Sequence, residues 1–156
     1  MQLRARQATP TAHVILRGGK VPNYNASSVD AASSAITAAG LTPCMMIDAS
    51  HGNSGKRHEN QPAVVDAIAG QIEAGDPRIG GVMVESHLVA GRQDWVAGKP
   101  LRYGQSITDG CIGWETSVRL LERLAAAVER RARTSLSALG RSSPSGRSTM
   151  CAQSSN

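Results

Sequence analysis

The sequence contains no phenylalanine, and it has only two tryptophans and two tyrosines among its 156 residues. Any hydrophobic core must therefore be built from valine, isoleucine, leucine, alanine and methionine. No apolar run approaches the roughly 18 residues that a membrane-spanning helix requires, so we expect no membrane partner. The length of the chain suits a single domain.

Cysteine is also scarce, and Cys44, Cys111 and Cys151 form an odd number without paired spacing. The N-terminus shows no apolar signal stretch. These two features are typical of a reduced cytosolic protein, and we expect a cytoplasmic location.

The net charge of +5 and the pI of about 9.6 raise the question of nucleic-acid binding. Residues 13–132 hold twelve basic and twelve acidic residues, so their net charge is zero. The excess comes from Arg4, Arg6, Arg133, Arg141 and Arg147 near the ends. Because no basic stripe with interleaved aromatic residues exists, we expect no nucleic-acid partner.

The charge pattern coincides with a division of the chain into three parts. Residues 1–12 are an irregular leader, and residues 13–132 are regular. Residues 133–156 are rich in serine and arginine and lack acidic residues. Such a segment buries too little apolar area to offset its chain entropy, and we predict that it is disordered.

Three short, nearly all-apolar runs occur in the regular part: "HVILRGG" (13–19), "CMMID" (44–48) and "GVMVES" (81–86). Such runs are typical of strands that are buried on both faces of a parallel sheet. A helical pattern follows each of them. The sequence therefore predicts an α/β fold of βαβαβα order.

The expected helices have recognisable ends. Ser27 and Asp30 resemble a capping box, and Gly40 closes the first helix. Pro62 suits the first turn of the second helix, and Gly75 suits its end. The inward faces are predicted to be Val29, Ala32, Ile36 and Ala39 in the first helix, Val65, Ile68 and Ile72 in the second, and Trp114, Val118, Leu121, Ala125 and Val128 in the third. Glu115 and Arg119 are expected to pair on the surface of the third helix.

Polar side chains follow each strand at an equal separation: Arg17, His51 and Glu85 are 34 residues apart each time. In a regular βα repeat this spacing gives equivalent positions at the carboxyl ends of neighbouring strands, which is the usual place of active sites in α/β folds. Asp109 follows in the loop before the last helix. An imidazole and two carboxylates suit Mn, Fe, Co or Zn. Arg17 suits a phosphate or a carboxylate.

Each of these residues also has a plain structural interpretation. His51 alone is more often a loop histidine than a ligand, Glu85 could be solvated, Asp109 could cap a helix, and Arg17 could pair with a surface acid. The other histidines (His13, His58 and His87) are interpreted as structural. Cys44 begins a strand at the opposite rim, and Cys111 is interpreted as a core residue.

Four motifs carry a resemblance to a known family: "HVILRGGKVPNY", "MIDASHGNSGK", "GVMVESHLVAGRQ" and "YGQSITDGCIGWE". In order and spacing they resemble the C-terminal portion of type I 3-deoxy-D-arabino-heptulosonate 7-phosphate (DAHP) synthase, over about residues 13–131. The resemblance implies the last three βα units of a (β/α)8 TIM barrel, which is incomplete here. It also implies condensation of phosphoenolpyruvate with erythrose 4-phosphate, the first step of the shikimate pathway of aromatic amino acid biosynthesis.

By the same resemblance, His51, Glu85 and Asp109 would be three of four metal ligands, and Arg17 would hold the phosphate of phosphoenolpyruvate. The family's cysteine ligand and its Lys-Pro-Arg-Thr segment for erythrose 4-phosphate have no counterpart in this sequence. The leader and the tail resemble no part of the family.

Three interpretations remain open on the sequence alone. The chain is part of a synthase that acts once the remaining barrel is supplied, or a truncated and inactive fragment that serves at most for interaction, or a small independent metal-binding module. Three parallel strands cannot close a barrel, and two sheet edges stay unpaired. We therefore expect the isolated chain to fold poorly or to associate with itself or with the missing barrel portion.

Overall fold

The computed structural model describes residues 14–139 and contains a three-stranded parallel sheet in the order β1-β2-β3. The strands are β1 (Val14–Leu16), β2 (Met45–Asp48) and β3 (Ile79–Met83). The helices are α1 (Ala26–Ala38), α2 (Gln61–Glu73) and α3 (Trp114–Leu139), and the 3-10 helix η1 (His58–Asn60) precedes α2. This order confirms the predicted α/β class and its parallel strands.

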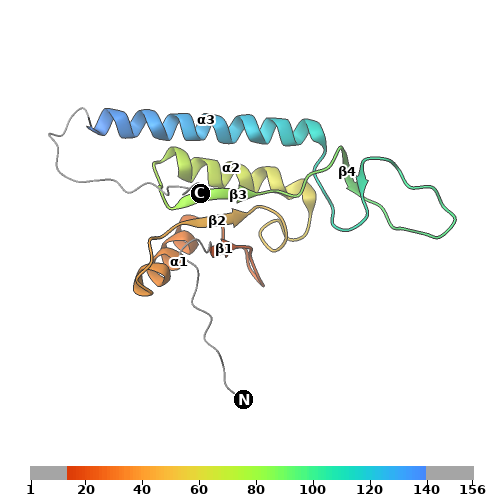
Figure 1. Ribbon diagram of the computed structural model, residues 1–156, viewed down its shortest axis with the longest axis horizontal. Helices are drawn as coiled ribbons and strands as arrows, with labels where there is room; N and C mark the ends of the chain where they lie inside the picture. Colours follow the sequence, from red (N-terminus) through yellow and green to blue (C-terminus); the bar gives the residue numbers. More distant parts are fainter. Residues whose placement is uncertain (1–13, 140–156) are drawn as a thin grey trace, which may run out of the picture.

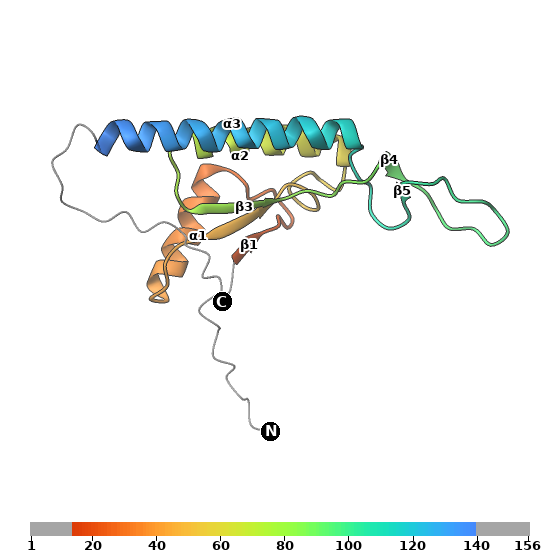
Figure 2. The ribbon, with the colours of Figure 1, turned by 45° about the horizontal axis from the view of Figure 1, so that its top comes forward.

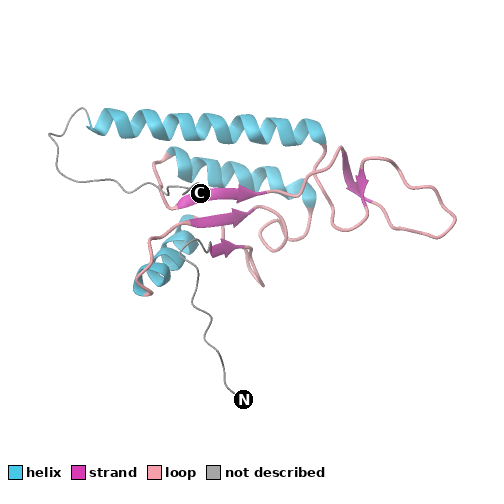
Figure 3. Ribbon diagram, viewed as in Figure 1, coloured by secondary structure: helices cyan, strands magenta, loops and turns pink. Residues whose placement is uncertain are grey.

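A second, two-stranded sheet was not predicted. Strands β4 (Val89–Arg92) and β5 (Gln105–Ser106) pair in parallel. Figure 3 shows them beyond the arrowheads of β2 and β3, and a long loop runs between them. They belong to the segment that carries the chain from β3 to α3.

The core lies on one face of the main sheet. Met45 and Ile47 of β2 are fully buried against helix residues such as Val65 and Ile68 of α2. On the other face, Ile15 is 47% exposed beside its partner Met46. The prediction that the strands are buried on both faces is therefore wrong for the described part of the chain.

Helices α2 and α3 lie side by side along the sheet, as Figures 1 and 2 show from two directions. The predicted inward face of α2 is confirmed, because Val65, Ile68 and Ile72 are buried. In α3 the predicted face is wrong. Leu120 and Ala127 are the buried residues, whereas Trp114, Leu121 and Val128 are exposed.

Several predicted helix ends are confirmed and others need correction. Pro62 lies in the first turn of α2, and Gly40 and Gly75 have positive φ angles after α1 and α2. The cap of α1 is Asn25 rather than the predicted capping box at Ser27, since the Asn25 side chain accepts a hydrogen bond from the backbone N–H of Ser28 at 2.9 Å.

The surface pair expected on α3 is not formed in the structure. Arg119 donates instead to the hydroxyl of Thr116 at 3.1 Å. A different set of ion pairs joins the two long helices: Arg123 and Arg130 of α3 both bind Glu73 of α2. These ion pairs fix α3 against α2.

The tail was predicted to be disordered from residue 133, but α3 continues to Leu139, so that boundary is wrong. The rest of the tail, the leader and His13 lie outside the described residues. Cys111 is a buried free thiol, as predicted. Within residues 14–139, no helix is long and apolar enough to span a membrane.

Candidate metal centre

The residues that follow the three parallel strands meet at the carboxyl end of the sheet. His51, Glu85 and Asp109 each offer one ligand atom, and these three atoms all lie within 4.8 Å of one another. The Nε2 atom of His51 is 3.2 Å from Oε1 of Glu85. Three of the four predicted residues therefore converge as the 34-residue spacing and the loop position indicated.

His51 is held in an unusual backbone conformation. Its φ angle is +45°, in the left-handed region that residues other than glycine rarely adopt. The loop after it folds back, because the backbone N–H of Lys56 donates to the His51 carbonyl at 2.7 Å and that of Ser54 donates to the Ser50 carbonyl at 3.2 Å. Strained positions of this kind are common where a side chain must be aimed.

The orientation of the His51 ring is set by a residue that the sequence analysis did not select. Asp48, the last residue of β2, is completely buried, and its Oδ2 lies 2.7 Å from Nδ1 of His51. Its Oδ1 accepts the backbone N–H of Ser50 at 2.8 Å. An ionised Asp48 can only accept, so Nδ1 of His51 carries a proton, and Nε2, the other ring nitrogen, faces Glu85 and is the atom left to bind a metal.

Glu85 is held through its backbone by Gln61, the first residue of α2. The Gln61 side chain accepts the Glu85 N–H at 2.9 Å and donates to the Glu85 carbonyl at 3.2 Å. Gln61 is fully buried. A double hydrogen bond to one residue fixes the end of β3 relative to α2 and leaves the Glu85 carboxylate free for the site.

Burial raises the pKa of Glu85, and the neighbouring carboxylates of Asp109 and Asp48 add to that effect. The charges of His51 and Arg17 act in the opposite direction. A carboxylate whose charge is disfavoured by burial and by like charges is stabilised by a cation. The surroundings of Glu85 are therefore suited to a cation.

Arg17 lies at the edge of the same site. Its Nε atom is 3.7 Å from Oδ2 of Asp48, and its side chain is 60% exposed. Arg17 and the three convergent residues line one cavity of about 450 Å³, together with Lys56 and His58. The fourth predicted residue therefore borders the cavity with its guanidinium largely available to an anion.

The loops after β1 and β2 are in direct contact. A side chain at Gly18, whose φ angle is +72°, would come within 2.6 Å of the backbone of Asn53. Asn53 joins the two strands, since its amide donates to the carbonyls of Leu16 at 3.0 Å and of Asp48 at 2.7 Å. This packing explains the glycine after Arg17 and keeps Arg17 and His51 at neighbouring positions.

The donor set fits a divalent metal. One neutral imidazole nitrogen and two carboxylate oxygens suit first-row metals, and a carboxylate that orients a ligating histidine is a usual partner of such a ligand. The thiol of Cys111 is not part of this group, and burial raises its pKa, which disfavours the thiolate needed for metal binding.

The chain also matches a known protein family. A sequence model of the DAHP synthetase I family matches residues 3–122. The match includes most of the leader, so the expectation that the leader resembles no part of the family is wrong.

Two curated relatives are both phospho-2-dehydro-3-deoxyheptonate aldolases. The chain is 48% identical to the Trp-sensitive phospho-2-dehydro-3-deoxyheptonate aldolase of Enterobacter agglomerans, over 84% of this chain and 38% of that protein. It is 54% identical to the phospho-2-dehydro-3-deoxyheptonate aldolase of Haemophilus influenzae, over 74% of this chain and 32% of that protein.

A solved structure also matches. The phospho-2-dehydro-3-deoxyheptonate aldolase from Francisella tularensis aligns with a TM-score of 0.75 and 47% identity, over 79% of this chain and 36% of that chain. The sequence described here thus spans about a third of the length of the proteins that it resembles.

Proposed function

Because this chain belongs to the DAHP synthetase I family, we propose that it supplies one part of the active site of a 3-deoxy-7-phosphoheptulonate synthase. The reaction joins C3 of phosphoenolpyruvate to the aldehyde carbon of erythrose 4-phosphate. Water adds at C2, and inorganic phosphate leaves by C–O cleavage. In this proposal the chain is the last three βα units of a (β/α)8 barrel.

His51, Glu85 and Asp109 would hold a divalent ion, which is Mn, Fe, Co or Zn by the chemistry of these donors. Such an ion supplies Lewis-acid polarisation of an aldehyde oxygen. The convergence of the three donor atoms within 4.8 Å is the observation that carries the proposal. The fourth ligand of the family, a cysteine, is not among the residues of this cluster.

Two residues outside the ligand set would also have separate roles in that site. Asp48 holds the proton on Nδ1 of His51, so the ring offers Nε2 as a fixed donor. Arg17 would bind the phosphate of phosphoenolpyruvate, because a planar guanidinium pairs with two phosphate oxygens at once. Correct placement of that dianion brings C3 and the aldehyde carbon together, and such placement is a large part of catalysis in bimolecular reactions.

A second candidate function rests on a specific observation. The sheet face with Ile15 is open, and α3 exposes Leu121 and Val128. Apolar surface of this kind is expected of a segment that needs a partner to complete its core. By this alternative the isolated chain is catalytically inactive and serves at most for interaction or for metal binding.

A complementation assay tests the main proposal. The chain is co-expressed with the portion of the Haemophilus influenzae relative that it does not cover, and phosphate release from both substrates is measured with Mn²⁺. We expect activity from the pair and none from either part alone. Arg17→Ala and Asp109→Ala should each abolish the restored activity.

Two outcomes would contradict the proposal. Activity that is unchanged by Asp109→Ala would remove the metal role, and a stable complex without activity would favour the interaction-only alternative. Turnover by the 156-residue chain alone would refute the expected need for the rest of the barrel.

A further inference from the structure

A histidine outside the ligand set touches the loop that carries Asp109. Gly110 directly follows Asp109, and a side-chain carbon built on Gly110 would lie 2.9 Å from Nδ1 of His58, 3.5 Å from its Cγ and 3.7 Å from its Cβ. The His58 ring therefore occupies the space that a side chain at position 110 would need.

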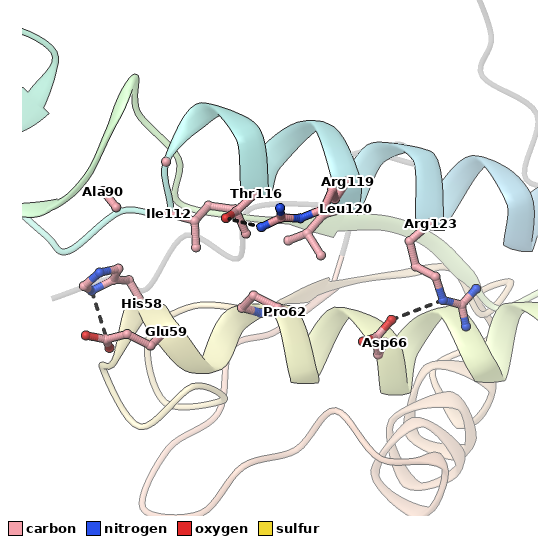
Figure 4. Close-up of a pocket in the computed structure, with 11 residues that line it drawn as sticks. His58, Glu59, Pro62, Asp66, Ala90, Ile112, Thr116, Arg119, Leu120 and Arg123 are labelled. Atoms are coloured by element: carbon pink, nitrogen blue, oxygen red, sulfur yellow. Dashed lines mark hydrogen bonds and ion pairs between the residues drawn. The ribbon is translucent and has the colours of Figure 1, made fainter.

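His58 is itself held in place from two sides. It begins η1, and the side chain of Asn60 at the other end of η1 donates to the Ser54 carbonyl at 2.9 Å. The Glu59 carboxylate lies 3.5 Å from Nδ1 of His58, as the dashed line in Figure 4 indicates. The short helix thus presents the ring from the same segment that carries His51.

The His58 ring lies between two cavities. His58 lines the candidate metal cavity and also a second cavity of about 460 Å³ between α2 and α3, whose lining is drawn in Figure 4. Its side chain is only 23% exposed. A half-buried ring in this place is a wall between the metal cavity and the helix groove.

The Asp109 carboxylate has few supports of its own. Asp109 is exposed, and within residues 14–139 its side chain takes part in no hydrogen bond or ion pair of the structure. On its C-terminal side the backbone is tied by Cys111 N–H to the Gly91 carbonyl at 3.2 Å and by Ile112 N–H to the Glu85 carbonyl at 3.0 Å. Gly110 stands between these ties and the ligand.

We propose that His58 is a positioning residue for the metal centre: its ring supports Gly110 and so sets the distance of Asp109 from His51 and Glu85. This inference depends on the proposed metal site and adds a residue to it. His58 is not a ligand here, because the donor cluster of the described residues contains only His51, Glu85 and Asp109. The segment from His51 to Gln61 then supplies one ligand, His51, and positions the other two: Gln61 holds Glu85, and His58 supports the loop of Asp109.

The test is a Mn²⁺ titration of the 156-residue chain by calorimetry, with wild type and variants at one protein concentration. His58→Ala should weaken binding about tenfold, the usual effect of losing a support behind a metal ligand. His58→Phe keeps a flat ring in that space without a nitrogen donor, and it should retain the wild-type affinity. Wild-type affinity in His58→Ala, or loss of affinity in His58→Phe, would overturn the proposal.

A double substitution tests the contact itself. Gly110→Ala should weaken Mn²⁺ binding, because the added methyl group meets the ring. In His58→Ala/Gly110→Ala the methyl group enters the vacated space, so the second substitution should add no further loss. Gly70→Ala is the matched control, because a side chain at Gly70 in α2 meets nothing within 4 Å. Additive losses would contradict the contact.

A measurement without metal separates this inference from the metal site. The ¹⁵N relaxation of the Gly110 amide should show increased motion in His58→Ala and not in His58→Phe. Asp109→Ala removes a ligand and should leave that relaxation unchanged. If wild type binds no Mn²⁺, the metal site fails, and the Gly110 amide still decides the role of His58: equal relaxation in wild type and His58→Ala would refute it.

Discussion

At the residue scale, the candidate site depends on contacts that are made behind the ligands. Asp48 fixes the proton of His51, and Gln61 fixes the backbone of Glu85. Both supporting side chains are fully buried. Buried and fully paired polar groups hold one geometry, since any rearrangement leaves an unsatisfied group in the interior.

Asp48→Asn tests the support behind His51. The amide of asparagine can donate to Nδ1, which would move the ring proton to Nε2 and block that atom as a ligand. We expect Mn²⁺ affinity to fall about tenfold, with a change in the imidazole ¹⁵N shifts that reports the other tautomer. Asp94→Asn, at an exposed position that pairs with Arg92, is the control. An unchanged tautomer would contradict this account.

Glu85 should make the stability of the metal-free chain depend on pH. Its pKa is raised above the ordinary 4.5, mainly by burial, so its charged form destabilises the metal-free fold. Below the pKa that Glu85 has in the unfolded chain, the carboxyl group is protonated in both states and the cost is absent. The cost appears as the pH rises through the higher pKa that Glu85 has in the folded chain. Glu85→Gln should therefore raise the urea midpoint at pH 7 and leave it unchanged at pH 4.

The midpoint is followed by circular dichroism, without metal and at a fixed protein concentration. Glu122→Gln, on the exposed surface of α3, is the control for removing one negative charge. A lower midpoint for Glu85→Gln at pH 7 would show that the ionised carboxylate stabilises the fold instead.

The sequence predicted the convergence of His51, Glu85 and Asp109, but it did not identify Asp48 and Gln61 as residues that support them, and it assigned His58 only a structural role. Equal spacing identifies the side chains at equivalent strand ends, because the βα repeat converts sequence distance into position. Asp48 could have been found, since it is a charged residue at the end of an apolar strand, three residues before His51. His58 and Gln61 gave no such signal, because their partners are backbone groups far away in the sequence.

At the scale of secondary structure, α3 shows where pattern analysis fails. The helix has apolar residues on two sides, with Leu120 and Leu121 adjacent in sequence. Periodicity alone cannot tell which side meets α2. In the structure Leu120 is 7% exposed and Leu121 is 64% exposed, and the ion pairs of Glu73 with Arg123 and Arg130 accompany the Leu120 side. Contacts between helices decided the face.

A glycine inside α2 and a glycine just after it give opposite predictions. Gly70 lies inside the helix with open space around it, so Gly70→Ala should stabilise the fold by about 0.5–1 kcal/mol. Gly75 ends the helix with a φ angle of +99°, so Gly75→Ala should destabilise it. Urea midpoints measured by circular dichroism test both. A stabilising effect of Gly75→Ala would mean that the helix end does not need a left-handed residue.

At the scale of the whole molecule, the described chain leaves apolar surface uncovered. Ile15 on the open sheet face and Leu121 on α3 are 47% and 64% exposed. Each large apolar side chain left in water forgoes roughly 1.5–3 kcal/mol, against about 5–15 kcal/mol for the stability of a whole domain. A few such residues therefore decide whether the chain is stable as a monomer.

We predict that the isolated chain associates through these apolar surfaces. Sedimentation velocity of wild type should show species larger than a monomer at micromolar concentration. Leu121→Glu with Val128→Glu should shift the distribution toward the monomer, and Glu122→Lys on the same helix should not. A sharp, cooperative melt of a wild-type monomer would contradict the prediction.

The central claim is that side chains from three separate loops hold one divalent ion. The most direct measurement is a Mn²⁺ titration of the chain, with His51→Ala, Glu85→Ala and Asp109→Ala beside wild type and Asp94→Ala as the control. We predict one ion bound per wild-type chain, loss of that binding in His51→Ala, and weaker binding in the other two ligand variants. Wild-type affinity in any of the three would contradict the claim.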